Sequence, residues 1–597
     1  MGDPDLSTPR SERPSHDRLD SWKEIAAYLK RDVTTVQRWE KRERMPVHRH
    51  QHDRLGSVYA FGSEIDAWVQ SRSLRFERQE KEHTAETPVD TEGDHQPRGT
   101  LPIPRWLVLT GVTLLAVLVP TYFTIRGHAR HTAQPRITSL AVLPLKNLSR
   151  DPAQEYLADG MTEELIGRLS MIHGLRVISR TSAMQYKDTQ LSVPEIAKVL
   201  HVDAVVEGSV LREGDRIRVH AQLIRAFTDE HFWSEEYDRD LTDVLALQSD
   251  VAQSIANKVE VTVTEKERER LSVARQVSPE VYESYLKAWS RFEKANTKAD
   301  IQQTVAAFEE TTKKDPTFAP AWVGLAQAYS ELGTVFVGGD PEESRAKLIT
   351  AARRALELDP RSADAYILLA SVQQKLWQWA EAEAGYKWAL ELNPNSASAH
   401  EHMASWLVCQ GRTQEAVDWA RRGRELDPLA VSGDWIAWIL FHAHRYDEAI
   451  HEVRSALAVN SDDEGALSTL GFVLIANNQP KEAIPVLEKA LTMSGRTPAT
   501  LGVLTRAYAH AGRRTDALRL VAELKERKRK GYVPAGAFVN AYLGLDERDQ
   551  AFAALEDAYA EHSNILQWMK VHPFMDPVRD DPRFKDLLHR VGLDRTY

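Results

Sequence analysis

The chain contains 597 residues, too many for a single hydrophobic core, so several domains are expected. Hydrophobic residues make up 42% and charged residues 27% of the sequence, a composition that excludes a wholly disordered protein. The net charge of −11 argues against a protein that coats nucleic acid with its whole surface. A single cysteine, Cys409, excludes an internal disulfide and a cysteine-based zinc finger.

The N-terminal region begins with a polar stretch and continues with two predicted helices. Residues 1–19 have no apolar run, so we expect them to be disordered and to contain no signal peptide. The stretch "SWKEIAAYL" then starts with Ser21 and Glu24, which form a capping box. A second helix is predicted from Val33 to about Arg42, with Asp32 as its cap. Two short helices joined in this way predict a helix-turn-helix.

A wing and a third helix are predicted after Pro46. The stretch "VHRHQHDRLGSVYAF" is β-like with Gly56 at a turn, and "SEIDAWV" follows as a helix capped by Ser63. The sequence therefore predicts a winged helix-turn-helix over residues 20–71. Between residues 21 and 54, nine Lys or Arg stand against five Asp or Glu, which supplies the positive charge that attracts phosphate.

Residues 20–71 resemble the excisionase/MerR-type winged-helix domains that begin many bacterial membrane-tethered regulators, through "TVQRWEKRE", "PVHRH" and "GSVYAF". By the pattern of that family, the second helix contacts bases and phosphates and the wing follows the DNA backbone. The resemblance implies these DNA-binding residues: Thr34, Thr35, Gln37, Arg38, Lys41, Arg42, Arg44, His48 and Arg49. The alternative is a helical module for protein contacts. His48, His50 and His52 alternate along the wing, but no carboxylate or cysteine pattern accompanies them, so no metal site is predicted.

A membrane segment is predicted after a charged linker over residues 72–104. Residues 106–125 carry no charge and are bracketed by Arg105 and Arg126. Twenty helical residues span roughly 30 Å, so a transmembrane helix is predicted over 105–126. A buried core helix is the alternative. The flanking charges do not decide the orientation. Because the N-terminus is predicted to bind DNA, we expect it in the cytoplasm of a bacterium, with the chain in the inner membrane and the C-terminal region in the periplasm.

Residues 137–262 alternate between strand-like and helical segments. The stretches "ITSLAVLPLKNL" and "LRVISRTS" are typical of buried strands, and "AQEYLADGMTEELIGRLSMI" is typical of an amphipathic helix. The stretch "DAVVEGSVLREGDRIRVHAQLIRA" predicts a hairpin that turns at "REGDR". These elements predict a small α/β domain. The domain resembles the TolB-N-like (FlgO-like) family through "EYLADGMTEELIGRLS", "LRVISRTSAMQYK" and "WSEEYDRDL", which implies protein or ligand contacts in the envelope.

No motif in the chain predicts catalysis. A phosphate-binding loop, a dinucleotide fingerprint, a zinc-binding HExxH helix and a nucleophile elbow are all missing from the sequence. The resemblance also implies that this middle domain, together with helical repeats, occurs attached to cyclases and kinases. Because the sequence offers no catalytic domain of its own, we predict no catalytic residue, no cofactor, no metal and no enzymatic activity.

From residue 278 to residue 560 the sequence repeats with a period near 34. One unit carries Trp322, Leu325, Ala326 and Tyr329, which is the large, large, small, large pattern of the tetratricopeptide repeats that the region resembles. Asp-Pro or Asn-Pro pairs recur at Pro316, Pro360, Pro394 and Pro428. Stacked helix pairs of this kind form a solenoid with a concave groove, where we expect a protein partner. Aromatic residues in "KLWQWAE" and "GDWIAWIL" serve either the core or the groove. Residues 561–597 are predicted to cap the last repeat.

Together these parts predict a multidomain fold. It consists of a small winged helix-turn-helix, one transmembrane helix, an α/β domain and an all-α tetratricopeptide solenoid. The layout is similar to that of ToxR-like membrane regulators. This layout predicts a membrane-anchored transcriptional regulator that binds DNA as a homodimer. The regulator is expected to couple DNA binding to an extracytoplasmic sensory region that has an unknown protein partner. The alternative is an envelope scaffold for protein–protein interaction, in which the winged helix does not bind DNA.

Overall fold

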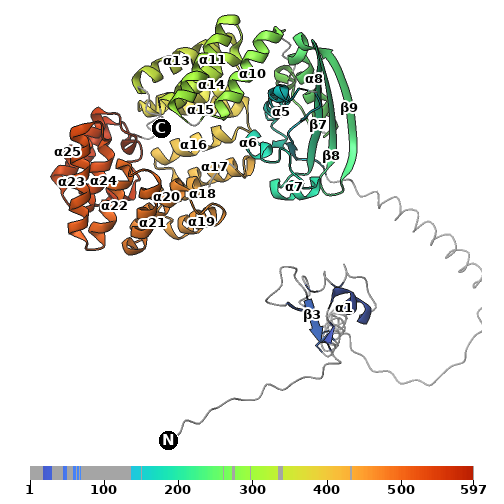
Figure 1. Ribbon diagram of the computed structural model, residues 1–597. Helices are drawn as coiled ribbons and strands as arrows, with labels where there is room; N and C mark the ends of the chain where they lie inside the picture. Colours follow the sequence, from blue (N-terminus) through green and yellow to red (C-terminus); the bar gives the residue numbers. More distant parts are fainter. Residues whose placement is uncertain are drawn as a thin grey trace, which may run out of the picture. The chain divides into compact units, whose positions relative to one another are not determined.

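The computed structural model describes two compact units, Met1–His128 and Ala129–Tyr597 (Figure 1). In the first unit it describes residues 18–19, 21–29, 36, 40, 45–49, 58–61, 64–65 and 68. In the second unit it describes residues 136–595, except for 150, 260, 272–275, 296, 334–340 and 430–432.

The first unit combines one described helix with a small antiparallel sheet. The sheet has the order β1 (Arg18–Leu19), β3 (Val58–Phe61), β2 (His48–Arg49). Helix α1 (Trp22–Tyr28) begins at Ser21, whose side chain accepts a hydrogen bond from the backbone N–H of Glu24 at 3.2 Å, as predicted. Strands β2 and β3 pair as the predicted wing. The core gathers these apolar side chains: Ile25, Ala26, Val36, Met45, Val58, Ala60 and Ile65.

The first unit differs from the prediction at its start. Disorder was expected over residues 1–19, but Arg18 and Leu19 pair with Phe61 and Ala60 and form an edge strand of the sheet. Leu19 also packs against the core of this unit. A two-residue strand has no periodicity of its own, so the sequence gives no local signal for it.

The α/β domain of the second unit is a mixed sheet with helices on it. Its strand order is β6-β4-β7-β8-β9, with β5 pairing with β7. Strand β4 is parallel to β6 and β7, and β7, β8 and β9 form an antiparallel meander whose first turn contains Gly214, where the hairpin was predicted. The strands are β4 (Ser139–Val142), β5 (Lys146–Asn147), β6 (Arg176–Val177), β7 (Ala204–Glu213), β8 (Arg216–Arg225) and β9 (Glu230–Asp240).

Helices cover the sheet unequally. Helices α5 and α8 lie on the face that is turned toward the helical repeats, and α7 lies near the other end of the sheet (Figure 1). The side chains of α5 and α8 form one core with the sheet, and those of α7 form a second, smaller core with β4 and β7, so that β4 is buried on all four residues. The helices are α5 (Glu155–Leu169), α6 (Arg180–Met184), α7 (Val193–Leu200), α8 (Val244–Lys258) and α9 (Glu265–Leu271).

The described helices from α10 to α25 form eight consecutive antiparallel pairs. The all-α repeat solenoid and the α/β region predicted from the sequence are thereby confirmed. The helices are α10 (Pro279–Glu293), α11 (Lys298–Lys314), α12 (Ala319–Leu332), α13 (Pro341–Leu358), α14 (Ala363–Lys375), α15 (Trp379–Leu392), α16 (Ala397–Cys409), α17 (Thr413–Leu426), α18 (Gly433–His442), α19 (Tyr446–Val459), α20 (Glu464–Ala476), α21 (Pro480–Met493), α22 (Pro498–His510), α23 (Arg514–Lys530), α24 (Ala535–Gly544) and α25 (Arg548–Ala560).

Small residues permit the close crossing of helices within and between pairs. A Cβ atom on Gly471 of α20 would lie 2.3 Å from the side chain of Leu487 on α21. A Cβ atom on Gly502 of α22 would lie 2.4 Å from the carbonyl oxygen of Ala537 on α24. The first contact explains why the repeat pattern demands a small residue, because a larger side chain would push the two helices apart.

The chain ends with a segment that turns back onto the solenoid. After α25 come the short helices η3 (Asn564–Leu566) and η4 (Pro573–Val578) and then α26 (Pro582–Arg590). Val591, just after α26, lies beside α15, since its carbonyl oxygen accepts a hydrogen bond from Nε1 of Trp379 at 2.8 Å, whereas η3 follows α25 directly (Figure 1). Residues 564–593, which we call the C-terminal segment, therefore run back along the solenoid.

The described helices do not include a membrane span. The longest of them, α13, has 18 residues, and seven of these are charged; no described helix is both long and apolar enough to cross a bilayer. This finding contradicts the predicted location as a single-pass protein of the bacterial inner membrane with a periplasmic C-terminal region. The predicted linker over 72–104 and the predicted transmembrane helix over 105–126 lie outside the described residues.

Candidate functional site

Two of the nine predicted DNA-binding residues fall in described parts of the first unit. His48 and Arg49 form strand β2 at the wing. The other predicted contacts lie outside the described residues: Thr34, Thr35, Gln37, Arg38, Lys41, Arg42 and Arg44. Val36, on the same predicted second helix, is completely buried in the core of the unit.

The imidazole of His48 has partners inside the wing. Its Nε2 atom lies 2.8 Å from Oε2 of Glu64, and its ring stacks on Tyr59 with the centroids 5.2 Å apart. A phosphate that approached this ring would also meet the carboxylate of Glu64, which repels it. Sequence reasoning missed Glu64, because nothing in the local pattern reveals that the third helix places its first turn beside β2.

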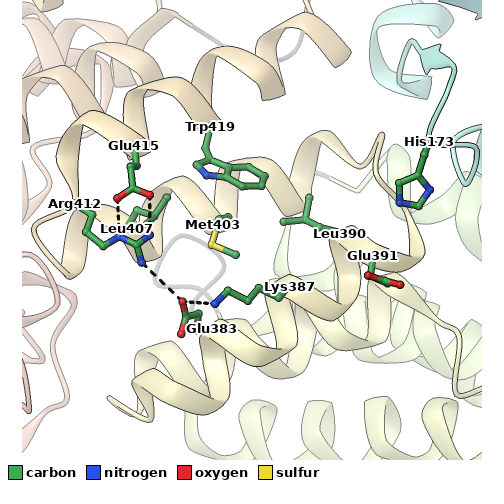
Figure 2. Close-up of a pocket in the computed structure, with 10 residues that line it drawn as sticks. All are labelled: His173, Glu383, Lys387, Leu390, Glu391, Met403, Leu407, Arg412, Glu415 and Trp419. Atoms are coloured by element: carbon green, nitrogen blue, oxygen red, sulfur yellow. Dashed lines mark hydrogen bonds and ion pairs between the residues drawn. The ribbon is translucent and has the colours of Figure 1, made fainter. Parts of the chain in front are cut away.

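A second candidate site is a pocket of about 400 Å³ on the repeats, between α15, α16 and α17 (Figure 2). Its floor is apolar, because Met403 and Leu407 of α16 are almost fully buried, and Trp419 of α17 forms one wall. We call it the outer pocket. Lining it are His173, Glu383, Lys387, Leu390, Glu391, Met403, Leu407, Arg412, Glu415 and Trp419.

The charges of the outer pocket neutralise one another. Nζ of Lys387 lies 2.7 Å from Glu383, and the guanidinium of Arg412 lies 2.7 Å from Glu415 and 3.9 Å from Glu383 (Figure 2). The hydrogen bond between Arg412 and Glu415 raises the pKa of Arg412 and lowers that of Glu415. The carboxylate of Glu415 therefore stays ionised and paired, and the carboxylate of Glu383 is paired with Lys387, so the outer pocket combines an apolar floor with paired charges.

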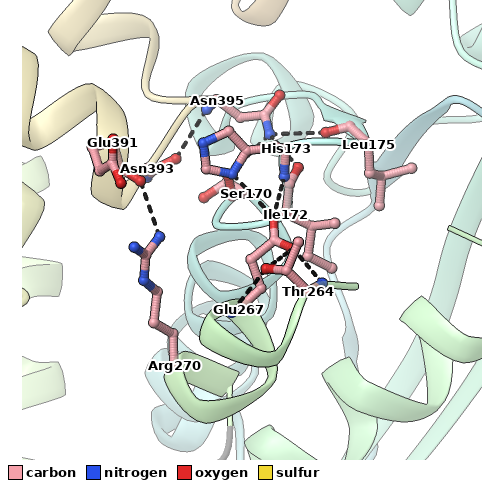
Figure 3. A network of polar contacts seen from close by, with 10 residues as sticks. All are labelled: Ser170, Ile172, His173, Leu175, Thr264, Glu267, Arg270, Glu391, Asn393 and Asn395. Atoms are coloured by element: carbon pink, nitrogen blue, oxygen red, sulfur yellow. Dashed lines mark hydrogen bonds and ion pairs between the residues drawn. The ribbon is translucent and has the colours of Figure 1, made fainter. Parts of the chain in front are cut away.

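The α/β domain is joined to the repeats by a buried asparagine. Asn395 lies in the turn between α15 and α16, and its Nδ2 donates to the carbonyl oxygens of Ser170 and Leu175 at 2.9 and 2.8 Å (Figure 3). Its Oδ1 accepts from the backbone N–H of Val177 at 3.2 Å. The next turn repeats the arrangement, since the hydroxyl of Ser182 donates to Asp427. Two of the repeat turns, with the pairs at Pro394 and Pro428, therefore also attach the α/β domain.

Glu267 holds the same corner of the α/β domain together. Its carboxylate accepts hydrogen bonds from the backbone N–H groups of His173 and Thr264 at 2.8 and 2.7 Å (Figure 3). Burial alone would raise the pKa of Glu267, but these hydrogen bonds outweigh burial and lower it to about 2. The carboxylate is therefore an ionised structural group. Among the residues that the structure describes, no three His, Cys, Asp or Glu side chains gather as metal ligands.

The comparisons with known proteins identify two parts of the chain. Residues 136–256 match the model of the HilA/YgeH-like transcriptional regulator, second domain. This range runs from β4 into α8 and falls on the residues for which a TolB-N-like domain was predicted. Tetratricopeptide repeat models match residues 373–431 and 474–537, in the solenoid.

One curated relative comes from Rhizobium meliloti (strain 1021) and is named "Putative adenylate cyclase 3". It is 33% identical over 250 residues, which is 42% of this chain and 42% of the relative. The chain thus spans less than half of the length of that relative. The match contradicts the prediction that the chain has no enzymatic activity, because the matched protein carries the name of an enzyme. The prediction rested on missing motifs, and motif searches detect only the active sites for which motifs exist.

Solved structures match the helical part at low identity. One, described as the functional characterization of Pseudomonas aeruginosa pilF, is 19% identical, with a TM-score of 0.30, and covers 40% of this chain and 98% of that chain. Another, the hetero-tetramer Cut9-Hcn1 of the APC/C, is 15% identical, with a TM-score of 0.36, and covers 58% of this chain and 62% of that chain. The chain thus contains a HilA/YgeH-like regulator domain followed by tetratricopeptide repeats.

Proposed function

We propose that the protein is a transcriptional regulator that binds DNA through residues 20–71 and a protein partner through its repeats. The match of residues 136–256 to a domain of HilA/YgeH-like transcriptional regulators carries the proposal. The wing of β2 and β3 and the excess of basic over acidic residues between positions 21 and 54 support it. One such domain makes few contacts, so it binds DNA as a homodimer on a two-fold related site.

The second predicted helix reads the DNA sequence in this proposal. Gln37 and Arg38 carry side chains that pair with two atoms of one base, adenine and guanine respectively, and Thr34 and Thr35 contact thymine methyl groups or phosphates. Lys41, Arg42, Arg44 and Arg49 neutralise phosphates along the backbone.

The test is selection of DNA from a random pool by the full chain, followed by titration of the selected sequence at about 50 mM salt. Arg38→Ala should weaken binding about 10-fold to 100-fold, because a bidentate contact to a base contributes about 1–3 kcal/mol. The matched control is Lys481→Ala, which removes one positive charge from an exposed position on α21. Failure of the wild-type chain to bind any selected DNA at this low salt concentration would remove the DNA-binding function.

The alternative function is a protein-interaction scaffold, which the tetratricopeptide repeats favour. In that case the first unit would bind protein. Mapping of the chain on chromatin distinguishes the two, because a regulator gives enriched sites that Arg38→Ala abolishes. A scaffold gives none and keeps its partner in pull-downs with the same variant.

A second candidate activity is nucleotide cyclisation, favoured by the match to the relative named as an adenylate cyclase. The test is incubation of the purified full chain with ATP and Mg²⁺ or Mn²⁺, followed by quantification of cyclic AMP. Product formation would assign the activity to this chain. Its absence, in a preparation that binds DNA, would assign the 250 matched residues to a regulatory or binding role in both proteins.

A further inference from the structure

One position of the repeat faces the inside of the solenoid. It follows directly after the small residue of the first helix in each pair, and it recurs every 33 or 34 residues as Ser371, Ser405, Trp438, Phe472, Arg506 and Asn540. We call this surface the inner face. Its residues differ in size, polarity and charge and range from serine to tryptophan and arginine, whereas the position before it holds three alanines, a glycine, a threonine and a valine. Positions that serve only the packing of repeats are uniform, so the variation indicates a surface with a specific ligand.

The C-terminal segment, residues 564–593, covers the inner face. Phe574 lies between Phe472 and Arg506, with its ring stacked on Phe472 at 5.4 Å and the guanidinium of Arg506 4.0 Å from its centroid. His572 lies with its ring centroid 5.3 Å from that of Phe441 and 6.2 Å from that of Trp438.

The covering segment is deeply buried. Leu566, Met569 and Met575 are completely inaccessible, and Phe574 is 1% exposed. Trp379 donates from Nε1 to the carbonyl oxygen of Val591 at 2.8 Å, which fixes the far end of the segment. The segment therefore occupies the inner face as a peptide ligand occupies a groove, with an aromatic anchor at its centre.

The groups beneath the segment are poorly satisfied. Nε and Nη1 of Arg506, Nε2 of His442 and Oδ1 of Asn540 are buried and have no hydrogen-bond partner among the residues that the structure describes. Arg506 is 3% exposed. A permanently closed core gains stability when such groups are replaced by apolar ones, because each unpaired buried donor or acceptor costs free energy. These groups would find partners if the segment left, either in water or in a different ligand.

We propose that the inner face is a peptide-binding surface and that the C-terminal segment is its displaceable ligand, bound within the same chain. The partner that competes for this surface presents a short helical turn of the same chemistry, a proline and an aromatic residue followed by methionine and an acidic residue, as in Pro573–Asp576 of η4. Asp576 forms an ion pair with Arg579 at 2.6 Å, and its negative charge also favours the ionised form of Arg506. The inference does not depend on DNA binding by the first unit.

The covalent connection between α25 and the C-terminal segment determines how easily a free partner can displace that segment. Only residues 561–563 separate α25 from η3, so the segment is held near the inner face at a high effective concentration. A free partner segment must exceed that concentration to displace it. We therefore expect the intact chain to exclude a free peptide and a chain cut at this connection to accept it.

The experiment uses the full chain with a specific protease site inserted after His562. The probe is a fluorescent synthetic peptide of residues 564–597 of this chain. After cleavage the folded chain should exchange its own segment for the probe, while the uncut chain should not. A probe with Phe574→Ala should bind about 100-fold more weakly, because it loses a buried aromatic side chain. The matched probe Arg595→Ala changes an exposed residue outside the segment and should bind like the wild type.

Four outcomes would overturn the proposal. The cleaved chain could retain its segment without exchange, or unfold on cleavage, and either result would make the segment an integral part of the core. The uncut chain could take up the probe as readily as the cut one, which would contradict occupation within one chain. Light scattering that shows a dimer of the uncut chain, dispersed by the probe, would assign the segment to the inner face of a second copy.

Discussion

Single side chains connect parts of this protein that are far apart in the sequence. Asn395 lies more than 200 residues after the carbonyl groups that it binds, as shown by its separation of 220 residues from Leu175. Its amide fits the site because Nδ2 donates to carbonyl oxygens while Oδ1 accepts from a backbone N–H. An aspartate would place a second acceptor against those carbonyls. Asn395 therefore connects the α/β domain to the repeats through hydrogen bonds that require an amide side chain.

We predict that Asn395→Ala lowers the free energy of unfolding of the second unit by about 2–4 kcal/mol, because it leaves several buried backbone groups unpaired. Asn395→Asp should be at least as damaging. Denaturation by urea measures the loss, and hydrogen exchange should report it first at β6. The matched control is Asn460→Ala, at the equivalent turn of a later repeat, where the side chain accepts only from the N–H of Asp462. Equal losses in both variants would contradict the fastening role of Asn395.

At the scale of elements, α18 and η4 form a buried contact between two histidines. The rings of His442 and His572 lie 5.2 Å apart at an angle of 87°. Burial lowers the pKa of His442 to about 3. Burial also lowers the pKa of His572, and the neighbouring His442, Arg506, Arg579 and His444 lower it further. Both rings are therefore neutral in the folded chain at neutral pH, and the contact between the C-terminal segment and α18 depends on that state.

Because the folded pKa values are depressed, the stability of the repeats should fall as the pH drops below about 6.5, the pKa of an unfolded histidine. Above that pH both states are neutral and the histidines have no effect. At pH 5.5 each buried histidine should cost about 1.4 kcal/mol, since only the unfolded chain takes up the proton. Urea titrations at pH 7.5 and pH 5.5 measure this difference.

Two variants isolate the cause of this pH dependence. His442→Phe keeps an aromatic ring in place and should reduce the loss between the two pH values by about 1.4 kcal/mol. Phe441→Leu perturbs the same core without removing a titratable group, so its stability should fall at both pH values with an unchanged difference. A His442→Phe chain with the pH dependence of the wild type would contradict the assignment.

At the scale of the whole molecule, charge is distributed unevenly along the chain. The net charge is −11, while residues 21–54 carry nine Lys or Arg against five Asp or Glu. An acidic protein is repelled by DNA except where its basic surface approaches, so the charge favours binding through the first unit alone. In the proposed function, the acidic remainder of the chain therefore favours one orientation of the protein on DNA.

We predict that the affinity of the full chain for its selected DNA falls with salt, with a slope of about −4 for each bound protomer in a plot of log K against log salt concentration. This corresponds to about half of the nine basic residues on phosphates. Arg42→Ala should reduce the magnitude of the slope by about 1, because it removes one phosphate contact. Lys481→Ala should leave the slope unchanged. A slope near zero in the wild-type chain would contradict an electrostatic contact with DNA.

The sequence by itself determined the local elements and their repetition. The small residue at positions such as Ala326 and Gly471 recurs with the period of a helix pair, and helix formation and pairing use contacts within about 34 residues. The hairpin at Gly214 and the cap at Ser21 were predictable for the same reason, since their partners lie a few residues away. Seven predicted DNA contacts, six on the second helix and Arg44 after it, stay predictions, because they lie outside the described residues.

Only the tertiary structure decided which residues cover the inner face of the solenoid and which residue connects the repeats to the α/β domain. The sequence suggested a capping segment over 561–597 and an open groove, whereas residues 564–593 cover the inner face and Asn395 joins the repeats to the α/β domain. Trp438 lines that face, whereas Trp379 is a fully buried core residue that donates a hydrogen bond to the segment. The sequence alone did not distinguish these two roles. The physical reason is distance along the chain. A contact between residues more than 200 positions apart depends on the superhelical path of all the repeats between them, and no local pattern records that path.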